Sequence, residues 1–236
     1  MKTETRHALK QDKFALAAKG GVSWVTEHSS SVIRLLIWGG AALVLIVGLL
    51  VFWGVETSAA KDAIGAALDT YSAPLSAPGA PPEPGSFATA TDRIKAANQQ
   101  FVSAVQKYGW LPEGARAHYF AGVTDMEMGQ TGSAETELNA AAGSWNRNTA
   151  NLARLALAQL YHQTGRDPLA ISTYNELIAK PSVTVSAAVA QLDLADLYVA
   201  AGKQDQARAL WAKIKDADKD GMAGSIASQK LAGKQQ

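Results

Sequence analysis

The stretch that decides the fold is NLARLALAQLYHQTGRDPLAISTYNELIAKP, residues 151–181. Alanine, leucine and tyrosine recur at helical spacing on both sides of Gly165. Glycine readily takes the left-handed conformation that ends a helix, and the next residues suit a new start, with Asp167 as N-cap and Pro168 in the first turn. The stretch therefore predicts two helices joined by a tight turn.

The same pattern recurs before and after this stretch. Gly129, Gly165 and Gly202 are 36 and 37 residues apart. The positions that match around them are Gly122, Ala158 and Ala195; Tyr161 and Tyr198; Ala134, Ala170 and Ala207; and Leu138, Tyr174 and Trp211. Small residues let two antiparallel helices approach closely, and the aromatic residues fill the space beside that contact. One such pair cannot bury its apolar faces alone, so we expect a stack of pairs.

These residues resemble the tetratricopeptide repeat (TPR) family, over about residues 113–215. Asp125 stands where the pattern has tyrosine, and the expected tryptophans are replaced by His118, Arg154 and Gln191. Ala97, Phe101 and Ala104 are expected to pack in the second helix of an earlier repeat, whose first helix is residues 58–73. The resemblance implies an all-α fold, in which an N-terminal transmembrane helix is followed by a TPR-like α-solenoid of three to four helix pairs.

A second stretch, RLLIWGGAALVLIVGLLVFWGVE (residues 34–56), has 21 uncharged residues between Arg34 and Glu56. At about 1.5 Å per residue, a helix of that length covers the roughly 30 Å of a bilayer core. We expect a transmembrane helix over 35–55. A cleaved signal peptide, with TSAAK as the cleavage region, is the alternative, but its apolar part would be shorter.

Charge predicts the orientation of that helix. Residues 1–34 carry six Lys and Arg against three acidic residues. The positive-inside rule puts them in the cytoplasm and residues 56–236 on the other side. Residues 1–34 are interpreted either as a basic amphipathic helix on the membrane surface or as a plain juxtamembrane segment.

The rest of the chain divides by composition. Residues 56–73 continue the membrane helix, and residues 74–87 hold five of the eight prolines, so they form a loop rather than a helix. That loop is interpreted as a connection, with a polyproline-binding partner as the alternative. The TPR-like domain spans 88–221, and a C-terminal capping helix or tail spans 222–236.

The order of these parts is similar to that of the YfgM family, which are ancillary subunits of the bacterial Sec translocon. The resemblance implies a single-pass protein of the bacterial inner membrane with a periplasmic C-terminal domain. Its partners would be translocon subunits, periplasmic chaperones or exported chains. The alternative is an assembly scaffold for another envelope complex, such as cytochrome or outer-membrane machinery.

The sequence contains no clear motif for nucleic-acid binding, thiolate catalysis or a calcium site. The net charge of +1 gives no sign of nucleic-acid binding, and a chain without cysteine has no thiolate nucleophile. The run DADKDG (216–221) resembles the start of a calcium loop, but Ala227 stands where the last ligand is needed. We expect no enzyme activity, cofactor, metal or small-molecule substrate.

In a TPR stack the first helix of each pair lines an inner groove. The groove-facing positions are Arg116, Tyr119, Val123 and Met126; Leu152, Leu155, Gln159 and His162; and Val189, Leu192, Asp196 and Val199. Most are apolar, which suits an apolar segment of a partner protein. The alternative is that several of them are core residues.

Overall fold

A computed structural model describes residues 29–77 and 84–233 of the chain. This part is all-helical, as predicted, apart from turns, loops and one isolated β-bridge. The helices are α2 (Ser29–Tyr71), α3 (Ala90–Tyr108), α4 (Gly114–Glu127), α5 (Thr131–Ala142), α6 (Arg147–Gln163), α7 (Asp167–Ala179), α8 (Ala187–Ala200), α9 (Gln204–Ala217) and α10 (Met222–Leu231).

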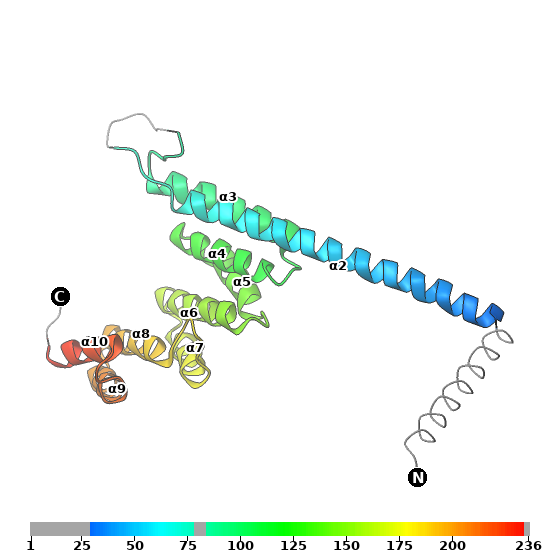
Figure 1. Cartoon of the computed structure of the whole chain (residues 1–236). Helices are drawn as coiled ribbons and strands as arrows, with labels where there is room; N and C mark the ends of the chain where they lie inside the picture. The colour runs from blue at the N-terminus through cyan, green and yellow to red at the C-terminus, as the bar shows by residue number, and fades with distance from the viewer. Residues whose placement is uncertain (1–28, 78–83, 234–236) are drawn as a thin grey trace, which may run out of the picture. The chain divides into compact units, whose positions relative to one another are not determined.

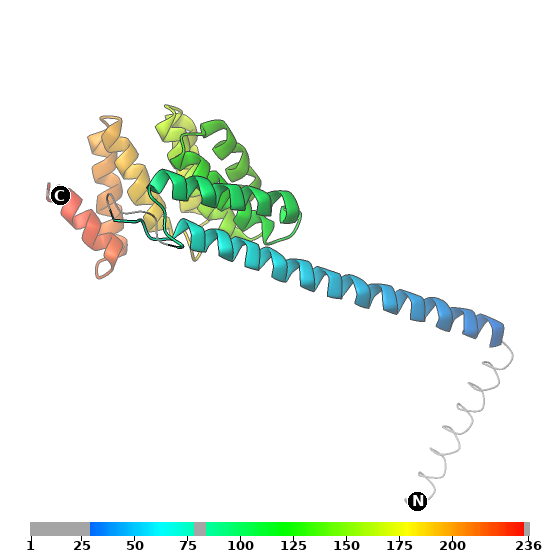
Figure 2. The same cartoon turned by 90° about the horizontal axis from the view of Figure 1, so that it is seen from above.

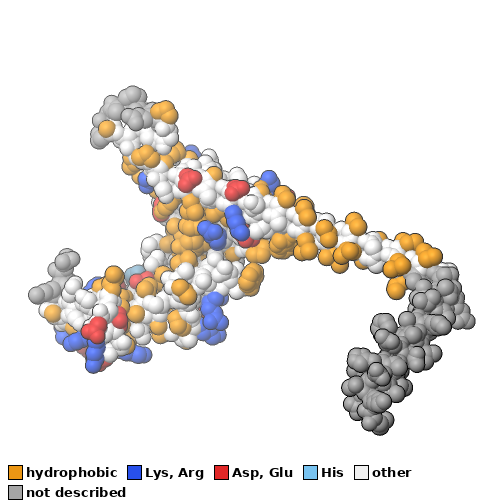
Figure 3. All heavy atoms as spheres, viewed as in Figure 1, with side chains coloured by type: hydrophobic (Ala, Val, Ile, Leu, Met, Phe, Trp, Pro, Cys, Tyr) orange, Lys and Arg blue, Asp and Glu red, His pale blue; other side chains and the backbone are white. Residues whose placement is uncertain are grey.

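The chain divides into two compact units, Met1–Val55 and Glu56–Gln236. The described part of α2, which begins in the first unit, is long and apolar enough to cross a membrane, and its most apolar stretch is not buried. Figure 3 shows apolar side chains along the length of this helix. Such a surface needs an apolar surrounding, which a bilayer supplies.

In the second unit, each helix from α3 onward packs against the next one along the chain. Figures 1 and 2 show the pairs α4–α5, α6–α7 and α8–α9 following one another, with α10 against the last pair. This is the expected order of elements for a series of helix pairs with a final covering helix.

Three identical turns join the helices within these pairs. Gly129, Gly165 and Gly202 have φ of +74°, +72° and +72°. The residue after each glycine donates its backbone N–H to a carbonyl five residues earlier, as Arg166 does to Tyr161 at 2.7 Å. This is the Schellman ending, and it confirms the left-handed caps predicted from the glycine spacing.

Small side chains lie where the helices of a pair meet. Ala158, Ala195, Ala134, Ala170 and Ala207 are all fully buried. At Gly122 the approach is closer still, because a Cβ there would lie 2.6 Å from Cγ of Leu138 on α5. The predicted close contacts of the helix pairs are therefore present.

Replacing a buried alanine with a larger residue tests the close packing within the helix pairs. Ala170→Leu or Ala207→Leu adds three carbons to a fully buried site, and each is expected to lower the free energy of unfolding by about 1–3 kcal/mol. Alanine and leucine are both good helix formers, so helix propensity contributes little. Ala140→Leu, at an exposed position of α5, is the matched control. Equal melting temperatures for all three variants of residues 56–236 would contradict the packing.

The end of α2 and α3 form a further pair at the start of the second unit. Ala60, Ile64 and Ala67 of α2 are buried in one cluster with Ala97, Phe101, Ala104 and Tyr108 of α3. Phe101 stacks on Phe120 of α4, with ring centroids 5.2 Å apart. The end of α2 is therefore part of the core of this unit.

Some local details differ from the sequence-based expectation. Asp167 is the first residue of α7 rather than its N-cap, and its carboxylate instead contacts Nδ1 of His162 at 2.7 Å. In the proline-rich loop, Leu75 pairs with Phe87, so the described ends of the loop are held together. The interpretations of residues 1–28, of 78–83 within the loop and of 234–236 lie outside the described residues.

Candidate functional site

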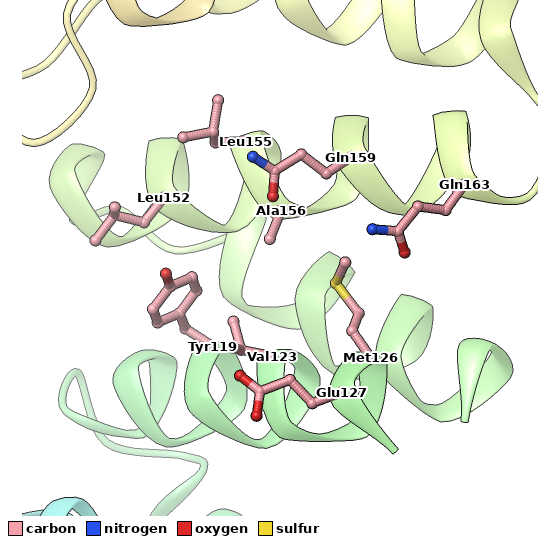
Figure 4. Close-up of a pocket in the computed structure, with 9 residues that line it drawn as sticks. All are labelled: Tyr119, Val123, Met126, Glu127, Leu152, Leu155, Ala156, Gln159 and Gln163. Atoms are coloured by element: carbon pink, nitrogen blue, oxygen red, sulfur yellow. The ribbon is translucent and has the colours of Figure 1, made fainter. Parts of the chain in front are cut away.

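A groove lies between α4 and α6, with a volume of about 410 Å³. From here on, "the groove" means the space lined by Tyr119, Val123, Met126, Glu127, Leu152, Leu155, Ala156, Gln159 and Gln163. In Figure 4, Tyr119, Val123 and Met126 rise from α4 toward α6. Glu127, Gln159 and Gln163 are exposed, whereas the apolar residues are buried or half-buried. The groove thus has an apolar floor and a polar edge.

The groove gathers half of the positions that the repeat pattern assigned to an inner face. These are Tyr119, Val123, Met126, Leu152, Leu155 and Gln159. Figure 4 shows Leu155 pointing away from α4. Both Leu152 and Leu155 are half-buried against a core cluster that includes residues of α8.

The remaining positions lie farther along the array. Gln159, His162 and Asp196 line a second hollow of about 210 Å³ together with Tyr174, Asp193 and Leu197. Asp196 and Val199 line a third hollow, among α8, α9 and α10. Arg116 and Val189 are exposed, and Leu192 is half-buried against a core cluster of α8, α9 and α10. Those three residues line none of the three hollows.

Shared residues connect the hollows. The groove and the second hollow share Gln159, and the second and third hollows share Asp196. The three hollows therefore adjoin one another along α4, α6 and α8, the first helices of the three pairs.

Sequence reasoning missed Glu127, Ala156 and Gln163 in the groove and Asp193 in the second hollow. The first three follow Val123, Leu152 and Gln159 by four residues, so they lie on the same helix faces. Adding the residue four positions after each predicted position would have included them in the predicted set.

A hydrogen bond fixes one edge of the groove. The Tyr71 hydroxyl, at the end of α2, donates to the Glu127 carboxylate. This bond, together with burial and the negative charge of Glu127, raises the pKa of Tyr71 to about 12. The tyrosine therefore stays protonated and remains a donor at neutral pH, so it holds Glu127 against the apolar floor.

The second hollow is acidic. The side chain of Gln159 donates to the Asp193 carboxylate at 3.2 Å, and the ammonium of Lys230 lies 2.7 Å from Asp196. Burial and the neighbouring Asp196 raise the pKa of Asp193, although the bond from Gln159 works against the shift. Burial and these two aspartates also raise the pKa of the Tyr174 hydroxyl. Negative charge is therefore incompletely compensated in this hollow.

Buried hydrogen bonds fix the side of α4 that faces α3. The amide of Asn98 on α3 donates to Oδ1 of Asp125 at 2.7 Å and to Oγ1 of Thr124 at 3.0 Å. Asp125 is only 3% exposed. Burial raises the pKa of Asp125, the bond from Asn98 partly offsets this, and the charge of Glu137 adds to it. The polar network takes the place of the tyrosine that the repeat pattern has here.

The raised pKa of Asp125 predicts a pH-dependent stability. A carboxyl whose folded pKa exceeds its ordinary value of 3.8 stabilises the fold below that value, and the contribution is lost as the pH rises through the folded pKa. Asp125→Asn keeps an oxygen acceptor for Asn98 and cannot ionise. The free energy of unfolding of the variant, relative to the native chain, should therefore increase as the pH rises through this range. Denaturant titrations at a series of pH values measure it.

The control for the pH series is Gln99→Asn, an exchange of two uncharged side chains at an exposed position of α3. Its difference from the native chain should stay constant over the same pH range, since neither side chain titrates. An equally constant difference for Asp125→Asn would contradict the assignment of the buried carboxyl.

The DADKDG run has a structural role. Asp218 follows the end of α9, and its carboxylate accepts a hydrogen bond at 3.2 Å from the backbone N–H of Gly224 in α10. Among the described residues no group of three or more His, Asp or Glu is placed to hold a metal ion.

Over residues 29–77 and 84–233, the structure is helical, with one helix long and apolar enough to span a membrane and a series of helix pairs that carry hollows. Comparisons with protein-family models, curated proteins and solved structures find no match to the chain. Its function is therefore inferred from its own residues.

Proposed function

We propose that the chain is a membrane-anchored, extracytoplasmic protein-interaction module made of TPR-like repeats, which binds a segment of a partner protein in the groove. The observation that carries the proposal is the groove itself. Its apolar floor and polar edge lie on the first helices of two consecutive pairs, at positions that the repeat spacing had assigned to an inner face. A partner's apolar side chains would bury against Val123, Met126 and Leu152.

The repeat class is supported by features that recur at one period. The three left-handed glycines share the same cap hydrogen bonds, and fully buried alanines follow each of them. Arg166 and Lys203, one residue after two of these glycines, lie over the rings of Tyr161 and Tyr198 with centroid distances of 4.7 Å and 5.8 Å. Equivalent residues thus make equivalent contacts in successive pairs, as expected for a repeat array.

The partner we propose is the Sec translocon of a bacterial inner membrane, with periplasmic chaperones or exported chains as further contacts. This proposal is supported by the order of the parts in the sequence: a basic segment comes first, then one apolar helix, and then the helix pairs. The proposal assigns no catalytic role. Purification in mild detergent tests the partner, since translocon subunits should be retained by the native chain and largely lost from Gln163→Trp, which fills the exposed edge of the groove and leaves its half-buried floor intact. Retention of another envelope complex instead would assign the chain to assembly of that machinery.

The proposal makes a prediction about topology. The excess of Lys and Arg before residue 35 predicts a cytoplasmic N-terminus and residues 56–236 on the opposite side. A reporter enzyme that is active only outside the cytoplasm, fused after Gln236, should be active, and a cytoplasm-dependent reporter at the same place should be inactive. The reverse pattern in a stable, membrane-inserted fusion would contradict the extracytoplasmic location. Release of residues 56–236 as a soluble product would favour a cleaved signal peptide.

A further inference from the structure

The chemistry of the grooved surface restricts what it can bind. The groove and the second hollow are neighbours, because Gln159 lines both. Three carboxylates lie along them, those of Glu127, Asp193 and Asp196. Among the described residues that line either space there is no Lys or Arg.

We propose that the groove binds a basic, apolar peptide segment of another protein, with apolar side chains on the floor between α4 and α6 and a Lys or Arg directed to the carboxylates of the second hollow. This inference rests on the proposed function and names the class of its partner. The occupant is inferred from charge complementarity, since an apolar floor selects apolar side chains and an adjoining acidic hollow selects a cation.

The existing contacts of the three carboxylates leave room for a cation. Glu127 accepts from the neutral hydroxyl of Tyr71, and Asp193 accepts from the neutral amide of Gln159. Within the part of the chain that the structure describes, Asp196 alone of the three has an ammonium partner, Lys230, and the Asp196 side chain is still 54% exposed. A partner's Lys or Arg would add the first cationic contact to Asp193. It would also offset the repulsion between the two aspartates, which adds to the burial that raises the pKa of Asp193.

An acidic or neutral segment fits the same surface less well. A glutamate at the second hollow would join two aspartates of like charge, and a neutral amide would leave their repulsion unchanged. Discrimination should therefore follow the order Lys over Gln over Glu. It should weaken as salt is added, because the hollow is partly open to solvent.

Three labelled peptides test the inference directly. They share one sequence of Leu and Ala and differ only in two positions that hold Lys, Gln or Glu. The full chain is placed in phosphatidylcholine nanodiscs, binding is followed by fluorescence anisotropy, and empty nanodiscs supply the background. The Lys peptide should bind about tenfold more tightly than the Gln peptide, as expected for a partly buried charge pair, and the Glu peptide should bind most weakly.

Substitutions then show which carboxylates cause the preference for the Lys peptide. The double variant Asp193→Asn, Glu127→Gln keeps the shape and the oxygen acceptors. It should bind the Lys and Gln peptides within about twofold of each other. Glu176→Gln removes one charge at an exposed position of α7 and should keep the full preference.

The outcomes separate this inference from the proposed function. Binding that Gln163→Trp abolishes, but without any preference for Lys, overturns the inference and leaves the groove function standing. Equal affinity or the reverse order in the native chain does the same. Failure of all three peptides to bind, or cross-linking of the groove to a second copy of the chain, overturns both.

Discussion

Phe101→Ala is expected to lower the free energy of unfolding of residues 56–236 by about 3–5 kcal/mol, since it removes a fully buried aromatic ring. Phe101 lies where the end of α2, α3 and α4 meet, and its ring stacks on Phe120. The resulting cavity cannot close easily, because its neighbours Ala60, Ala67 and Ala97 are small and belong to rigid helices. Thermal and denaturant unfolding measure the loss.

The matched control is Trp145→Ala, which removes a larger ring that is 80% exposed and should change stability by about 0.5 kcal/mol or less. If the two variants unfold alike, Phe101 is not in a core and the packing of α3 against α2 and α4 is wrong.

Leu155→Asp and Leu192→Asp are expected to destabilise the array by about 2 kcal/mol or more each, because a carboxylate then replaces a side chain packed on a core cluster. Both leucines occupy inner-face positions in the repeat pattern, yet both are half-buried between helix pairs. Their main role is packing of one pair on the next. Circular dichroism melts of residues 56–236 give the result.

Leu169→Asp on α7 provides the comparison, since Leu169 is 50% exposed and the same substitution there should be nearly neutral. Leu155→Met, which keeps apolar volume, should retain both fold and partner binding. Native-like melting of Leu155→Asp and Leu192→Asp would instead place both side chains on an open surface, and loss of binding in those folded variants would extend the groove to them.

The sequence predicts the parts of this fold that depend on local geometry. A glycine before a new helix start predicts a left-handed cap whatever surrounds it, and Gly129, Gly165 and Gly202 all have one. An alanine at a fixed offset from such a turn faces the partner helix, and Ala170 and Ala207 are both fully buried. The apolar composition of residues 35–55 likewise needs no tertiary information.

The remaining features depend on partners that are distant in the sequence. The repeat pattern marks Asp125 as a departure, but its donor Asn98 is 27 residues away on another helix. The second hollow acquires its charge from Asp193, which lies between two pattern positions, and Glu127 is fixed by Tyr71 from α2. For Leu155, the helical periodicity predicts which face of α6 carries the side chain. It does not predict how far α8 covers that face, so the sequence alone allowed Leu155 to be either a groove residue or a core residue.

The central claim is that the groove binds a segment of a partner protein, and site-specific photocross-linking in intact cells tests it most directly. A benzophenone amino acid is placed at Met126, whose side chain points into the groove, and in a second chain at Asn175, on the exposed outer surface of α7. The account predicts one dominant cross-linked protein from Met126 that Asn175 does not capture, joined through a segment rich in apolar residues with Lys or Arg. Equal products from both positions, or none from Met126 in a stable, membrane-inserted chain, would contradict it.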